Sequence, residues 1–192
     1  MATSILKREA SYQIYGGVNK ERSFNTGVTK QIGLARSIGG KLVLHLPSRG
    51  FCDAFDVGFQ RLHELYPGLR RDQTNGWELH LEKGQFELLA EAAHSSIRPV
   101  DGTPGHFREG YYLQPSYRIT RNLSAVARYD LLDRDNTRAD KNALARQSLG
   151  LTCRPWALLS LKIEADRYQP ERGRLPAYYG ASVAVIYFFH LP

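Results

Sequence analysis

The sequence predicts an all-β protein in which antiparallel strands run up and down and form a transmembrane β-barrel. Three observations predict this fold. Apolar and polar residues alternate with a period of two along most of the chain, short and long connections alternate, and aromatic residues gather near the predicted strand ends. The 192 residues include 23% charged residues, a proportion that suits one folded domain over residues 1–192 and not a disordered polyelectrolyte.

Period-two alternation marks about ten segments as strands. The clearest is Tyr111–Ile119, whose odd positions read Tyr, Leu, Pro, Tyr and Ile, while the positions between them are mostly polar. Pro115 cannot donate a hydrogen bond to a neighbouring strand, so we expect a bulge or local defect there. The other predicted strands are Tyr12–Val18, Gln31–Arg36, Lys41–Leu46, Trp77–Leu81, Phe86–Ala92, Leu123–Leu131, Leu149–Cys153, Leu159–Ala165 and Ala181–Phe189.

The predicted connections alternate between short and long. Tight turns are expected at Gly39-Gly40, Gly84-Gln85, Arg121-Asn122 and Pro155-Trp156. Long polar connections are expected at Asn19–Thr29, Pro47–Gly76, His94–Arg108, Asp133–Leu144 and Gln169–Tyr178. Outer-membrane barrels have short turns on the periplasmic side and long loops outside. The segment 47–76 is therefore expected to be a long loop, either extracellular or folded into the lumen.

The direction of the apolar face separates two kinds of barrel. In a water-soluble barrel the apolar face lines the interior, whereas in a membrane barrel it contacts lipid. The polar face carries many charged residues, and the aromatic residues lie where interfacial girdles place them. We therefore expect the apolar face to contact lipid. A soluble or periplasmic barrel that binds an apolar ligand, and a non-conducting structural barrel in the outer membrane, are the alternatives.

Composition and motifs exclude several other classes of protein. No apolar run approaches the ~20 residues of a membrane helix. The net charge is +7, but Lys and Arg are mixed with acids and match no nucleic-acid-binding motif, so no nucleic-acid partner is expected. The cysteines and histidines lack disulfide or metal-ligand spacing, and no catalytic motif is present, so we expect no enzyme, cofactor or metal. The first residues lack the apolar core of a signal peptide.

Charged residues on the predicted inward face are the candidate functional residues. The cations lie on consecutive predicted strands, with acids between them. Two roles for these charges remain open. They form a salt-bridge network that holds the wall, or a ladder that guides anions through the lumen. The cations are Arg118, Arg128, Arg146, Arg154 and Lys162, and the acids are Glu91, Asp130, Glu164 and Asp166.

Two long segments and the last predicted strand share a family pattern. They are "GYYLQPSYRITRNLSAVARYDLLDRD" (110–135), "LGLTCRPWALLSLKIEADR" (149–167) and "SVAVIYFF" (182–189). They resemble the C-terminal half of phosphate-selective porins of Gram-negative bacteria. In that family a Gly-Tyr/Phe-Tyr strand precedes an Arg-Tyr-Asp sequence and an Asp-rich loop, whose places are held here by Arg128-Tyr129-Asp130 and Asp133–Asp140.

The resemblance implies a channel of the cell outer membrane for passive diffusion of small anionic solutes such as phosphate. Its expected partners are outer-membrane lipid, small anions and, in a homo-oligomer, further copies of the chain. Members of the family have about sixteen strands. This chain is therefore expected to be either the C-terminal portion of a larger barrel or a smaller barrel that closes on itself.

Overall fold

The computed structural model describes residues 2–6, 10–25, 28–46, 50–66, 70–133, 143–156, 158–170 and 176–187, with side chains from residue 10 onward except 19–35. This described part forms one antiparallel sheet, in which each strand pairs with the next along the chain. The eleven strands are β1 (Ala2–Leu6), β2 (Ala10–Asn25), β3 (Val28–His45), β4 (Ala54–Tyr66), β5 (Arg70–Lys83), β6 (Phe86–Pro99), β7 (His106–Arg118), β8 (Leu123–Asp133), β9 (Ala143–Trp156), β10 (Leu159–Pro170) and β11 (Tyr178–Tyr187).

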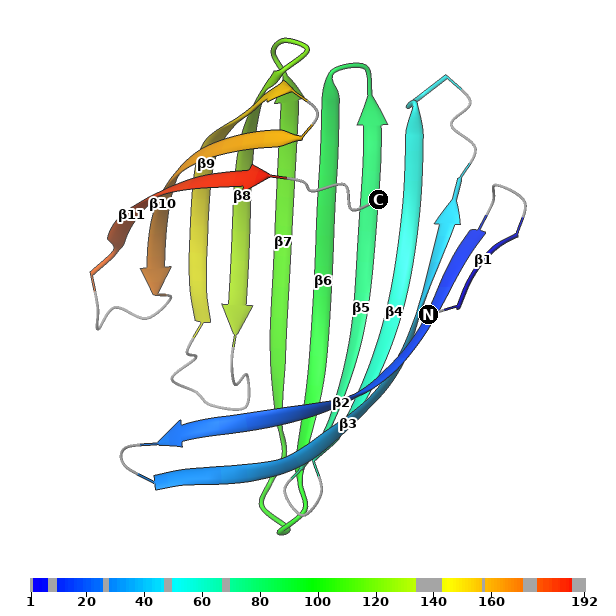
Figure 1. Cartoon of the computed structure of the whole chain (residues 1–192), viewed down its shortest axis with the longest axis vertical. Coiled ribbons are helices and arrows are strands. Elements are labelled where there is room, and N and C mark those ends of the chain that lie inside the picture. The colour runs from blue at the N-terminus through cyan, green and yellow to red at the C-terminus, as the bar shows by residue number, and fades with distance from the viewer. Residues whose placement is uncertain are drawn as a thin grey trace.

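The sheet is strongly curved. In Figure 1, β4–β8 run side by side down the molecule, while β2–β3 at one end of the sheet and β9–β11 at the other bend across it. Among the described residues β1 does not pair with β11, so the sheet is an incomplete cylinder with two free edges. No helix in this part is long and apolar enough to cross a membrane. The predicted all-β, up-and-down fold is confirmed.

The pairing register divides the side chains between two faces. Arg128 of β8 lies opposite Ser148 of β9, which lies opposite Asp166 of β10, so these polar residues share one face. Their neighbours Ala127 and Leu149 are paired in the same way on the other face. The same division extends across the sheet from β3 to β11.

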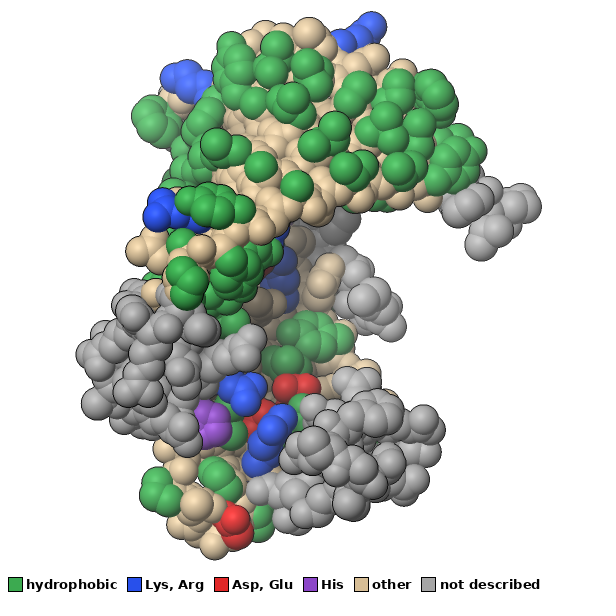
Figure 2. Space-filling model, turned by 90° about the vertical axis from the view of Figure 1, so that its left-hand side faces the viewer, with side chains coloured by type: hydrophobic (Ala, Val, Ile, Leu, Met, Phe, Trp, Pro, Cys, Tyr) green, Lys and Arg blue, Asp and Glu red, His purple; other side chains and the backbone are tan. Residues whose placement is uncertain are grey.

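The apolar face is the outer one. Trp77, Leu149 and Val183 keep 59%, 69% and 73% of their surface exposed, whereas Ser148 and Asp166 on the polar face are buried. Figure 2 shows hydrophobic side chains spread over the convex surface and charged side chains inside the hollow. No large hydrophobic side chain among the described residues is completely buried. A soluble barrel with an apolar interior, one of the alternatives, therefore does not fit this structure.

The short connections form where the sequence has turn residues. Gly84, in the turn between β5 and β6, has a φ of 60°, a conformation that costs a residue with a Cβ about 1–2 kcal/mol. In the next short connection, between β7 and β8, the Ile119 N–H donates to the Leu123 carbonyl at 2.9 Å.

From β5 onward short connections alternate with longer ones, as predicted, but the bounds differ. The connection expected at His94–Arg108 covers only 100–105, because β6 extends to Pro99 and β7 begins at His106. The turn expected at Pro155-Trp156 lies further along, between Trp156 and Leu159, because β9 continues to Trp156.

The expectation of a loop at 47–76 is wrong, because the segment contains β4 and the first half of β5. Phe55 and Phe59 of β4 lie on the apolar outer face, but the next outward positions are Arg61 and His63. Here the strand extends beyond the apolar part of the outer face. The apolar–polar alternation stops in mid-strand for this reason, which is why the sequence pattern missed β4.

The turn predicted at Gly39-Gly40 is also wrong, because β3 runs straight through it. A Cβ on Gly39 would lie 2.6 Å from the Tyr15 ring and 2.7 Å from the Arg61 carbonyl oxygen, so glycine makes room here instead of turning the chain. Most of the long connection expected at Asn19–Thr29 is strand as well. One strand, β3, was split in two, and β1 and β4 were missed, so about ten strands were expected where the described residues form eleven.

Pro115 interrupts the pairing of β7 with β8 without shifting it. Leu113 lies opposite Tyr129 and Ser116 opposite Val126, so the register is the same on both sides of the proline. Proline lacks an N–H, and the ladder skips Gln114 and Pro115. The local defect expected from the sequence is present, but the bulge is not.

The turn at Gly84 gives a direct test of this backbone. Gly84→Ala should lower the free energy of unfolding by about 1 kcal/mol, because alanine resists a positive φ. Urea unfolding of the folded protein in detergent micelles measures the change. Gly16→Ala is the matched control, since the nearest atom would lie 3.5 Å from the new Cβ and this glycine shows no positive φ. Equal losses in both variants would contradict the assignment of the turn.

Candidate functional site

The concave face carries all the charged residues selected from the sequence. The structure divides the cations into two groups, one that is ion-paired and one that lines a cavity near the short turns. On this face lie Glu91 of β6, Arg118 of β7, Arg128 and Asp130 of β8, Arg146 and Arg154 of β9, and Lys162, Glu164 and Asp166 of β10.

Arg146 is the centre of the ion-paired group. Its guanidinium lies 2.9 Å from the Asp166 carboxylate, 3.7 Å from Glu164 and 4.0 Å from Asp130. The Ser148 hydroxyl donates to Asp166 at 2.6 Å, so this buried carboxylate has two partners. Three acids from β8 and β10 therefore converge on one arginine of β9, which ties the three strands together.

Arg128 and Lys162 are paired as well. The Arg128 Nε donates to Asp130 at 2.7 Å, and the guanidinium carbon lies 4.5 Å from the centre of the Tyr112 ring, within range of a cation–π contact. Lys162 Nζ lies 3.0 Å from Glu164. The predicted salt-bridge partners Asp130, Glu164 and Asp166 thus make such contacts. Glu91 lies opposite Glu78 and makes no ion pair among the described residues.

Arg118 and Arg154 line a cavity of about 380 Å³ on the concave side near the short turns. Arg121, from the turn between β7 and β8, and Lys162 line it too, as do Glu82 and Glu87 of the β5–β6 hairpin. Arg118, Arg121 and Arg154 are exposed, and within the described residues none of them has an ion pair. Their charge is therefore available to a solute.

The far wall of the hollow, built by β3–β6, holds a second set of polar contacts. Lys41 Nζ lies 2.6 Å from Glu78, whose side chain folds over Gly58 so closely that a Cβ there would force it to move. Asp56 accepts from His45 at 2.8 Å and lies 3.3 Å from His80. These contacts bring residues of β3, β4 and β5 together on the concave face.

Sequence reasoning missed several of these residues. Asp56 and Gly58 fell in the segment taken as a loop, and Arg121 was assigned only to a turn. The signal for β4 was its short alternation of Phe55, Val57 and Phe59, which continues on the inward positions as polar or small residues. The role of Arg121 at the cavity depends on how the turn folds, which alternation does not encode.

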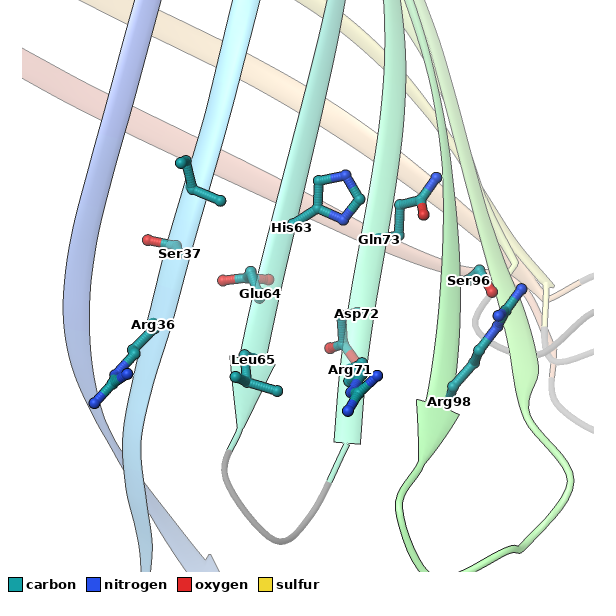
Figure 3. Close-up of a pocket in the computed structure, with 11 residues that line it drawn as sticks. Arg36, Ser37, His63, Glu64, Leu65, Arg71, Asp72, Gln73, Ser96 and Arg98 are labelled. Carbon is teal, nitrogen blue, oxygen red and sulfur yellow. The ribbon is translucent and has the colours of Figure 1, made fainter.

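The outer face bears a groove of about 430 Å³ beyond its apolar part (Figure 3). Arg36, Leu65, Arg71 and Arg98 lie in one cross-strand row from β3 to β6. Like charges directly opposite each other, as at Arg71 and Arg98, are unfavourable in an apolar setting and tolerable in water or beside anions. This row therefore marks a polar border of the outer face.

The comparisons with known proteins identify the fold and no family. No protein-family model and no curated protein matches the sequence. Among solved structures, the fold is similar to an anion-selective porin from Comamonas acidovorans, with a TM-score of 0.66 and 13% identity. The similarity covers 96% of this chain and 53% of that porin, so the chain spans about half of its length. The chain has a porin-like fold, and the resemblance to phosphate-selective porins has no support from family or sequence matches.

The two groups of arginines should differ in their effect on stability. Arg146→Met removes the cation nearest to the buried Asp166, leaves Glu164 with Lys162 alone, and should lower the free energy of unfolding by about 1–3 kcal/mol. Arg118→Met, at an exposed residue with no ion pair in the described part, should change it by less than about 0.5 kcal/mol. Urea titrations followed by tryptophan fluorescence measure both. Equal effects would show that the ion pairs do not hold the wall.

Proposed function

We propose that this chain forms part of the wall of an outer-membrane, porin-like channel through which small anions diffuse passively. The observation that carries the proposal is the division of the sheet into an exposed apolar convex face and a charged concave face, on which three arginines have no ion pair among the described residues. The two halves of the proposal, the membrane setting and the preference for anions, rest on different residues.

The outer face supports the membrane setting. Phe59, Trp77, Ala92, Tyr111 and Leu131 form one continuous cross-strand row from β4 to β8. One step further towards the long connections, the corresponding row reads Arg61, Asn75, His94, Glu109 and Asp133. A change from apolar and aromatic to polar along a single row is typical of a membrane interface.

The height of the apolar band agrees with a bilayer. On β7 the outward residues from Tyr111 to Tyr117 are apolar, and Ile119 continues them. At about 3.4 Å per residue this stretch is about 27 Å long, and a strand tilt of about 40° gives it a height of about 21 Å, comparable to the ~25 Å apolar band of outer-membrane barrels. Tyr117 and Phe86, which lie opposite each other, provide aromatic residues at the second border.

The cavity near the short turns supports a preference for anions. It is lined by Arg118, Arg121, Arg154 and Lys162 against two glutamates. Guanidinium groups bind oxyanions such as phosphate through paired N–H donors. Among small anions, we therefore propose phosphate as the specific solute. Arg128 and Arg146, selected together with them from the sequence, are held by acids and contribute mainly to the wall.

The free edges support a larger wall. In hydrocarbon every backbone N–H and C=O must be paired, so β1 and β11 need partners there. The similar porin is about twice as long as the part that this chain matches. We propose that further strands, from a longer chain or from other copies, complete the cylinder.

Adjacent residues on opposite faces test the membrane setting. Leu151→Arg puts a charge on the convex face and should lower the free energy of unfolding in lipid vesicles by about 2–4 kcal/mol. Thr152→Arg puts the same charge on the concave face and should cost less than about 1 kcal/mol. Unfolding from vesicles in guanidinium chloride provides the measurement. A soluble protein that never enters vesicles, or equal costs for both variants, would contradict the proposal.

Replacement of the unpaired arginines tests the preference for anions. The unmodified protein in a planar bilayer should show an anion-selective reversal potential in a KCl gradient, and added phosphate should reduce the chloride current. Arg118→Glu combined with Arg154→Glu should shift the reversal potential towards cations. Arg71→Glu, on the outer face, is the control and should leave it unchanged. Cation preference in the unmodified protein would refute the proposal, and absence of current would favour a non-conducting structural barrel.

A further inference from the structure

A histidine and two glutamates meet on the concave face beside the turn between β5 and β6. His80 Nε2 lies 3.2 Å from Glu87 Oε1 and 3.6 Å from Glu82 Oε1. The three candidate ligand atoms all lie within 4.8 Å of one another. Ligands of a tetrahedral zinc ion, each about 2.0–2.2 Å from the metal, lie about 3.3 Å apart. The geometry points to a binding site for a divalent transition-metal ion such as Zn²⁺ at His80, Glu82 and Glu87.

The hairpin itself brings these side chains together. The two-residue turn at Gly84-Gln85 fixes the register, which places Glu82 opposite Glu87. His80 is two residues before Glu82 and therefore shares its face. Two carboxylates directly opposite each other repel. A cation between them removes this repulsion, and His80 Nε2 offers a third ligand atom at that place.

The surrounding contacts orient the ligands as metal sites require. Metal-binding histidines commonly direct their other ring nitrogen to a carboxylate, which fixes the ring. Here His80 Nδ1 lies 3.3 Å from Asp56, and Asp56 is itself held by His45 at 2.8 Å. The second oxygen of Glu87 accepts from the Ser116 hydroxyl at 3.0 Å. Support therefore comes from β3, β4 and β7, on both sides of the hairpin.

The ligand types favour a transition metal over calcium or magnesium. Ca²⁺ takes six to eight oxygen ligands and Mg²⁺ keeps oxygen ligands in an octahedron, whereas imidazole suits Zn²⁺, Co²⁺ and Ni²⁺. One imidazole and two carboxylates with partial exposure leave a fourth position for water or a solute atom. Zn²⁺ is therefore the ion to test first, with Co²⁺ as its coloured substitute.

The site borders the cavity lined by Arg118 and Arg154, because Glu82 and Glu87 are the two glutamates of that cavity. A bound divalent cation would offset both carboxylates and leave the arginines as the dominant charge. This consequence rests on the proposed function: Zn²⁺ should increase the anion preference of the channel. Metal binding itself does not depend on conduction, so the two can fail separately.

Zinc binding to the folded protein in detergent micelles tests the site. Isothermal titration should show one saturable Zn²⁺ per chain that His80→Gln, Glu82→Gln or Glu87→Gln weakens tenfold or more. Asp56→Asn, which leaves the ligands in place, should weaken it roughly 10–100-fold. Co²⁺ should give a visible absorption band that Zn²⁺ abolishes and excess Ca²⁺ does not. Loss of heat-modifiable gel migration identifies any variant that fails to fold. The variants that still fold then show whether these side chains bind zinc.

His94→Gln is the matched control. His94 lies 3.1 Å from Glu109 on the outer face, a histidine–glutamate pair without a second carboxylate ligand in the described part of the chain. Its zinc affinity should equal that of the unmodified protein. The site is refuted if the unmodified protein binds no zinc saturably, or if His80→Gln and His94→Gln have equal effects. Zinc binding with an unchanged reversal potential would keep the site and refute its link to conduction.

Discussion

Residue-by-residue pairing between neighbouring antiparallel strands is the constraint on which the two faces of this protein depend. Side chains alternate along each strand, and paired residues share a face, so one register assigns every side chain to the convex or the concave side. Across β4–β8 the register also aligns Phe59, Trp77 and Tyr111 in one row and Arg61, Asn75 and Glu109 in the next. A slip of one residue would exchange the faces and place charges among exposed apolar side chains.

The same register sorts the charges inside the hollow. Arg146 is surrounded by acids from both neighbouring strands, whereas Arg118 lies opposite Ser124, Arg154 lies beside Asn122, and neither arginine has an ion pair among the described residues. A paired charge in a wall contributes mainly to structure, because its field is largely offset by its partner. An exposed, unpaired charge in a cavity can act on a mobile ion. The glutamates of the β5–β6 hairpin line the same cavity and bring negative charge to it.

Sequence alternation predicted β6, β7, β8 and β10 well, because their outward positions stay apolar over a complete membrane-sized stretch. It failed at β4, where the strand continues past the apolar band and its outward residues become Arg61 and His63. It failed again at Gly39, where glycine accommodates the Tyr15 ring inside β3 and does not turn the chain. In both places the residue type is set by a neighbouring strand or by contact with solvent. A one-dimensional pattern holds no information on such contacts.

Local alternation was sufficient to establish an all-β meander, the two chemically different faces, and the membership of Arg118, Arg128, Arg146, Arg154 and Lys162 in the polar face. These properties follow from strand geometry alone. Which arginines are neutralised, which line a cavity, and which residues meet His80 depended on contacts between strands far apart in the sequence. The curvature of the sheet and its free edges likewise came from the assembled strands, because twist and closure are properties of a whole sheet.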